Sequence, residues 1–142
     1  MHCADWKSRG ANTSSFMINN LKHCSIEFRG NDGKKHIGGI PDFQFVPRQF
    51  SYESPCKANA FVEFKSPQFS DEGVYIPLKY KKTSEIEHEY ENCNKIIFTD
   101  GISWYFLRKH QIDILEKPVN LIENPDNWDI LKNKITNFVN EN

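Results

Sequence analysis

Apolar and polar residues alternate along the first third of the chain, and this alternation predicts short strands. Within residues 23–30, Cys24, Ile26 and Phe28 alternate with polar neighbours, as expected for a strand with one buried face. An Asn-Asp-Gly turn sequence follows, and the chain then returns as an extended segment up to residue 46. The pattern predicts a strand meander over 24–46, a short helix over 14–21 and an irregular N-terminal segment over 1–13.

The middle of the chain predicts a loop over residues 47–57 and then a buried strand. The run NAFVEFK at 59–65 is apolar and strand-like, and Pro67 ends it. Gly73 and Pro77 argue against one long helix between residues 68 and 82.

The last third of the chain predicts helix, hairpin and helix. Ser84 and Glu87 have capping-box spacing at the start of a helix over 84–92. The short strands 95–99 and 102–107 are joined by an Asp-Gly turn.

A final helix is expected over 124–140, with Asn124 as its cap and Pro125 at the first helical position. Its apolar stripe would consist of Trp128, Leu131, Ile135 and Phe138. Trp104 and Trp128 are both expected in the core. The element order predicts one α/β domain over 1–142 with a central sheet.

Composition narrows the class of protein. The chain has 142 residues, which suits one domain, and 13% aromatic residues, which can fill a core. It contains neither an apolar run long enough for a membrane helix nor the apolar core of a secretory signal, so we expect a cytoplasmic protein with no membrane partner. A net charge of −1 excludes DNA binding by overall charge alone.

The four cysteines are widely spaced and form no CxxC pair, so free thiols are expected. A zinc site built from the adjacent pairs His2–Cys3 and His23–Cys24 is disfavoured, because adjacent ligands are poorly placed to share one metal.

Three residues carry the candidate chemistry: Asp42, which follows Pro41 in the strand-like run IPDFQF, and Glu63 and Lys65 in AFVEFK. Glu63 and Lys65 are two residues apart and therefore face the same side of a strand. Asp42, Glu63 and the backbone carbonyl of Phe64 could hold Mg²⁺. Lys65 could orient or deprotonate the attacking water and neutralise the charge at the phosphorus centre. The alternative is an ion pair on a solvated strand face.

These motifs, in this order, resemble the PD-(D/E)xK nuclease superfamily, and the similarity extends over roughly 26–140. Thr99, Asp100, Gly101 and Trp104 fit the hairpin that follows the catalytic strands in nuclease domains of restriction-modification enzymes. The resemblance implies a restriction-endonuclease-like fold, with a central mixed β-sheet flanked by helices. It also implies Mg²⁺-dependent hydrolysis of DNA, with Mn²⁺ as a substitute, in a restriction-modification or DNA-repair type system.

Two family features are displaced here. Tyr90 matches the tyrosine of the following helix, but position 86 is Ile where relatives carry Gln. Residues 14–21 lack the glutamate that relatives supply from the first helix. Glu27 is then either an accessory ligand or a solvated glutamate on its predicted strand. An inactive nuclease-fold module that binds DNA or acts as a scaffold is therefore the alternative function.

The sequence also leads to expectations about protein partners and about a surface that could contact DNA. Because the charge is near neutral, a homodimer or a larger specificity-providing protein would select the DNA target. Lys79, Lys81 and Lys82, with Tyr75 and Tyr80 nearby, form either a weak DNA-backbone contact or a solvated loop.

Overall fold

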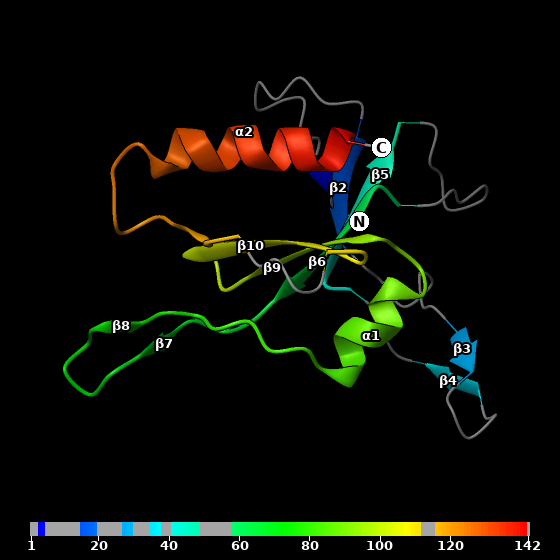
Figure 1. The fold of residues 1–142 in the computed structure, drawn as a ribbon, viewed down its shortest axis with the longest axis horizontal. Coiled ribbons are helices and arrows are strands. Elements are labelled where there is room, and N and C mark those ends of the chain that lie inside the picture. The colour runs from blue at the N-terminus through cyan, green and yellow to red at the C-terminus, as the bar shows by residue number, and fades with distance from the viewer. Residues whose placement is uncertain are drawn as a thin grey trace.

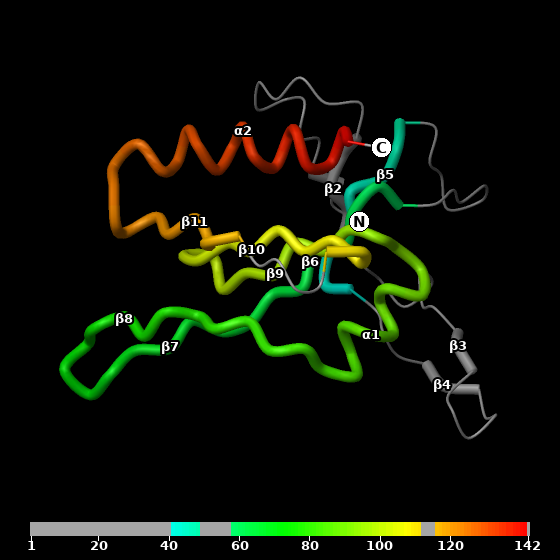
Figure 2. The backbone as a smooth tube through the Cα atoms, viewed as in Figure 1, coloured from blue at the N-terminus to red at the C-terminus, as the bar shows by residue number. Residues whose placement is uncertain are grey.

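The computed structural model describes residues 41–48, 58–111 and 116–141, together with the backbone of four short strands before residue 40 (Figures 1 and 2). The elements are β1 (Cys3–Ala4), β2 (Ser15–Asn19), β3 (Glu27–Arg29), β4 (Lys35–Ile37), β5 (Phe43–Pro47), β6 (Ala60–Phe64), β7 (Gln68–Phe69), β8 (Tyr75–Ile76), α1 (Ser84–Tyr90), β9 (Lys95–Thr99), β10 (Ser103–Arg108), β11 (Val119–Asn120) and α2 (Asn127–Asn140).

A seven-stranded mixed sheet forms the centre of the molecule, in the order β1-β2-β5-β6-β9-β10-β11. Its neighbouring strands are antiparallel except for β6 and β9, which are parallel. Helix α1 lies in the connection between these two strands, as a parallel crossover requires. The pairs β3–β4 and β7–β8 form separate two-stranded sheets. The predicted mixed α/β class is confirmed.

The two helices cover opposite faces of the sheet (Figure 1). The alternation of side chains along β6 explains this arrangement, because Ala60 and Val62 pack in a cluster with α2, whereas Phe61 packs in a cluster with α1. Glu63 follows the same alternation and therefore belongs to the α1 face. The sequence places a carboxylate where an apolar residue would complete the core.

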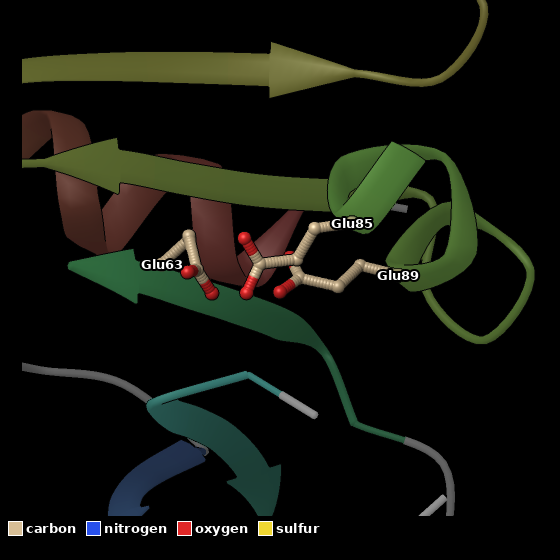
Figure 3. A group of neighbouring side chains, drawn as sticks. All are labelled: Glu63, Glu85 and Glu89. Atoms are coloured by element: carbon tan, nitrogen blue, oxygen red, sulfur yellow. The ribbon is translucent and has the colours of Figure 1, made fainter. Parts of the chain in front are cut away.

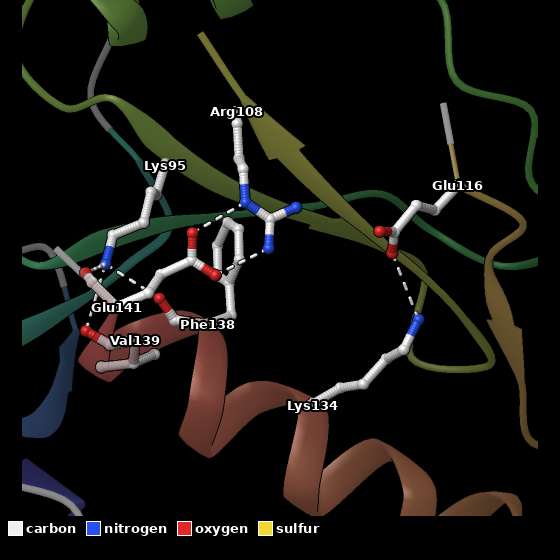
Figure 4. A network of polar contacts seen from close by, with 7 residues as sticks. All are labelled: Lys95, Arg108, Glu116, Lys134, Phe138, Val139 and Glu141. Atoms are coloured by element: carbon white, nitrogen blue, oxygen red, sulfur yellow. Dashed lines mark hydrogen bonds and ion pairs between the residues drawn. The ribbon is translucent and has the colours of Figure 1, made fainter. Parts of the chain in front are cut away.

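The C-terminal end of α2 is held to the sheet by a polar network (Figure 4). The Lys95 ammonium donates to the carbonyls of Phe138, Val139 and Glu141 at 2.8, 3.2 and 2.7 Å. These carbonyls lie where a helix runs out of backbone donors. The Arg108 guanidinium pairs with both carboxylate oxygens of Glu141 at 2.8 and 2.7 Å and lies 4.9 Å from the Phe138 ring centroid.

The helix expected over 14–21 is a wrong prediction, because residues 15–19 form strand β2, which pairs antiparallel with β5. The apolar run Phe16–Ile18 spans less than one helical turn, and pairing with β5 satisfies its backbone in an extended form. Strand β1 also lies within the segment that was expected to be irregular.

Helix α1 begins at Ser84 as predicted, but the capping residues of both helices differ from the prediction. Thr83, one residue before Ser84, caps α1 by accepting from the backbone N–H of Ile86 at 3.3 Å. Helix α2 begins at Asn127, because Asn124 accepts from Asp126 N–H in a local turn that precedes the helix. Trp128 is 55% exposed and does not belong to the core, whereas the other three residues of the predicted stripe are buried.

The remaining elements of the second half agree with the expectation. The strand within 59–65, the helix within 84–92 and the hairpin β9–β10 are present, and residues 68–82 contain a short hairpin in place of a long helix. The turn at 31–33, most of the 47–57 loop and the side chains of the disfavoured zinc site lie outside the described residues.

Candidate metal centre

Glu63 is a buried carboxylate near the end of a central strand. It lies on β6 between β5 and β9, and only 3% of its surface is exposed. Charged residues are rarely this buried unless they have a partner. The Lys65 ammonium donates to Oε1 of Glu63 at 3.1 Å. Oε2 of Glu63 has no hydrogen-bond partner among the described residues.

Two further glutamates reach Glu63 from helix α1. Glu85 and Glu89 are four residues apart and therefore lie one turn above each other on one side of the helix. Figure 3 shows both side chains directed toward Glu63 on the strand. The three carboxylates each offer one oxygen, and these oxygens lie within 4.8 Å of one another. Opposite ligands of one octahedral Mg²⁺ are separated by about 4.2 Å, so a small adjustment would let the three share an ion.

Glu89 is the most unusual member of this cluster. It is completely buried, and neither of its carboxylate oxygens has a hydrogen-bond donor among the described residues. Burial, with the neighbouring Glu63, raises the pKa of Glu89 to about 10. Burial also raises the pKa of Glu63. Without a cation, one proton shared between Glu89 and Glu63 relieves the repulsion; a divalent cation could take the place of that proton.

Lys65 provides the positive charge at the mouth of the cluster. Its ammonium lies 3.1 Å from Glu63 and 3.2 Å from Glu85. Partial burial lowers the pKa of Lys65, but the hydrogen bonds and charges of Glu63 and Glu85 outweigh that effect, and the net pKa is raised. Lys65 is therefore a cation here and suits charge neutralisation better than proton abstraction.

Asp42 lies immediately before β5, and the register that pairs Phe43 with Val62 puts Asp42 opposite Glu63. Its Oδ2 accepts from the backbone N–H of Phe64 at 2.8 Å. Asp42 is exposed, and its negative charge adds to the raised pKa of Glu63. The structure thus brings Asp42, Glu63 and Lys65 to one end of the strands, with Asp42 outside the group of three glutamates.

The other predicted site residues lie elsewhere. Tyr90 is the last residue of α1, and its side chain is buried in the apolar cluster between this helix and the sheet. Glu27 lies on β3 in a separate sheet, and its side chain is outside the described residues. Lys79, Lys81 and Lys82 are exposed on the segment between β8 and α1. Lys82 pairs with Glu87 at 3.1 Å.

Glu85 and Glu89 were not identified from the sequence. The family pattern points instead to position 86 and to the N-terminal segment for a further ligand. The available indication was the spacing of two glutamates four residues apart on the first helix predicted after Lys65. It did not reveal that Glu89 faces the sheet.

Comparison of the chain with protein-family models, curated proteins and solved structures found no match. Within the part of the chain that the structure describes, no helix has the length and apolar character needed to cross a membrane.

Proposed function

We propose that this protein is a Mg²⁺-dependent endonuclease that hydrolyses DNA phosphodiester bonds. The observation that carries the proposal is a pair of buried carboxylates, Glu63 and Glu89, with three oxygens that have no donor among the described residues. Unpaired buried carboxylates are costly. In a cation site, the bound cation offsets this free-energy cost. Mg²⁺ and Mn²⁺ both bind well to a ligand set made only of carboxylates.

Glu63 and Glu89 would hold the metal, with Glu85 and Asp42 on the exposed side of the site. Mg²⁺ bound there would supply a Lewis acid that activates water and stabilises the negative charge on the phosphate. Lys65, a cation that already contacts two of the carboxylates, would bind a non-bridging phosphate oxygen and orient the attacking water.

Two further features support a nuclease. Asp42, Glu63 and Lys65 lie together at one end of adjacent strands, in the order that the PD-(D/E)xK resemblance implies. A mixed central sheet with a helix on each face is compatible with a restriction-endonuclease-like fold. Such a module would belong to a restriction-modification or DNA-repair type system and would act as a homodimer or with a specificity-providing protein.

Calorimetric Mg²⁺ titration beside single-turnover cleavage of plasmid and single-stranded DNA tests the proposal. Lys65→Ala should abolish cleavage but keep or improve Mg²⁺ affinity, because it removes a positive charge beside the site. Glu63→Ala should lose both cleavage and Mg²⁺ binding. Lys132→Ala, an exposed change on α2, is the matched control and should keep both.

Cleavage by Lys65→Ala at the wild-type rate would contradict the role of Lys65. If the wild-type protein binds DNA but cleaves no substrate with Mg²⁺ or Mn²⁺, the inactive binding module is the correct function.

A further inference from the structure

A pocket of about 580 Å³ adjoins the candidate metal centre. It lies between the base of the β7–β8 hairpin, the segment that leads to α1, and β9, with Phe98 among its lining residues. Lys65 lines the pocket and also bonds Glu63 and Glu85. A molecule bound in the pocket would therefore touch the lysine of the candidate centre.

One part of the pocket suits an anion. Lys65, Lys79 and Lys81 line it, against a single carboxylate, Asp100. That carboxylate already accepts from the backbone N–H groups of residues 102 and 103 and from the Tyr75 hydroxyl. Lys79 and Lys81 form no ion pair with a described residue. A phosphate would meet ammonium donors there with little competition from the protein's own acids.

The other part of the pocket is apolar. Ile76, Pro77, Leu78 and Phe98 line it, and Ile76 remains 46% exposed. Exposed apolar surface beside cations matches a ligand that has both a charged group and a flat apolar face. The volume lies in the usual range for a ligand pocket, about 300–1,000 Å³, and exceeds what a lone phosphate needs.

We infer that this pocket holds one nucleotide of a single DNA strand, with its phosphate on Lys79 and Lys81 and its base against the exposed side chains of Ile76 and Pro77. A base inside a duplex is stacked and paired and cannot present its face to such a wall. The inference deepens the proposed function and rests on it for the choice of DNA. It makes single-stranded or locally opened DNA the preferred substrate.

Fluorescence anisotropy with a labelled twelve-residue oligothymidine, in buffer that contains EDTA, tests the pocket without cleavage. Lys79→Ala/Lys81→Ala should weaken binding about tenfold, since two phosphate contacts are lost. Lys82→Ala is the matched control, because Lys82 neighbours both residues but pairs with Glu87 and does not line the pocket; it should change affinity less than twofold. Gln68→Trp, which fills the pocket without altering charge, should also weaken binding about tenfold.

Two binding results would overturn the inference: equal weakening by Lys82→Ala, or equally tight and equally sensitive binding of a blunt duplex of the same length. Cleavage by the double variant with unchanged KM and kcat would also refute the pocket, while the proposed nuclease would stand. Conversely, oligonucleotide binding that depends on Lys79 and Lys81, in a protein that cleaves nothing with Mg²⁺, would support the pocket and refute the nuclease.

Discussion

At the scale of single residues, the pair Glu63–Glu89 carries an electrostatic cost that should be visible in stability. A carboxyl group with a raised pKa binds its proton more tightly in the folded than in the unfolded protein. Its contribution is complete below the unfolded value of about 4.5 and is lost as the pH rises toward the folded value of about 10. In EDTA, the free energy of unfolding should therefore fall as the pH rises through this window.

The slope for one such proton approaches about 1.4 kcal/mol per pH unit. Glu89→Gln removes the titrating group while keeping the shape of the side chain, so its unfolding free energy should vary less with pH and exceed the wild-type value at pH 8. Glu87→Gln, on the exposed side of the same helix, should keep the wild-type slope. Urea denaturation between pH 5 and 9 measures this, and parallel curves for wild type and Glu89→Gln would contradict the assignment.

Two glycines have positive φ, and only one of them lies close to another side chain. Comparing their replacement by Ala therefore distinguishes the cost of backbone strain from the cost of a steric contact. Gly101 in the β9–β10 turn has φ 89°, and a Cβ there would lie 3.2 Å from Cζ of Phe64. Gly73 in the β7–β8 turn has φ 78° and open space around it. Each change to Ala should cost about 1–2 kcal/mol for the left-handed backbone, and Gly101→Ala should cost more because the Phe64 ring must also move. Equal losses in thermal melts would show that the ring yields freely.

At the scale of elements, Lys95 joins β9 to the end of α2. Its ammonium serves three carbonyls that the helix leaves without donors. Lys95→Met keeps most of the apolar stem but removes the donors, and should destabilise the protein by about 1–3 kcal/mol. Lys132→Met, which removes an exposed pair with Asp129, should cost less than about 0.5 kcal/mol. Urea denaturation of both variants provides the comparison, and a similar loss in both would contradict the capping role.

Elements whose sequence pattern agrees with their tertiary setting were predictable. Strand β6, helix α1 and the β9–β10 hairpin combine apolar runs with turn or capping residues, so local preference and burial favour the same structure. Strand β2 was not predictable, because its short apolar run fits a helical turn as well as a strand, and β5 decides between them. The spacing of Trp128 fits the apolar stripe and predicts burial, but this residue lies in the first turn of α2 and is 55% exposed.

The candidate site likewise contains residues that the sequence predicts and residues that it does not. Asp42, Glu63 and Lys65 follow from strand alternation and neighbouring strands, which are local rules. Glu89 faces Glu63 only because a crossover helix packs over a parallel strand pair, and residue spacing alone does not specify which side of that helix meets the sheet. The sequence could therefore indicate the chemistry of the strands but not the ligands that the helix supplies.

At the scale of the whole molecule, the two helices lie on opposite faces of the sheet and are held there by different interactions. On one face, α2 is fixed by an apolar cluster and by Lys95 and Arg108. On the other face, α1 has only seven residues and directs two glutamates toward Glu63. Repulsion among these carboxylates opposes the docking of α1 and leaves α2 untouched.

Mg²⁺ should therefore stabilise one face of the protein. At a concentration about 100 times the dissociation constant, binding adds about 2.7 kcal/mol to the free energy of unfolding, and the midpoint of thermal unfolding should rise accordingly at pH 8. For amides that exchange through local opening and not through global unfolding, Mg²⁺ should slow hydrogen exchange in α1 and at the end of β6, where the ligands lie. Exchange of such amides in α2 should stay unchanged. Glu89→Gln should lose both effects, and Glu87→Gln should keep them. Protection centred on α2, or protection that survives in Glu89→Gln, would show that Mg²⁺ binds elsewhere, because an ion held by ligands from both β6 and α1 would protect those two elements.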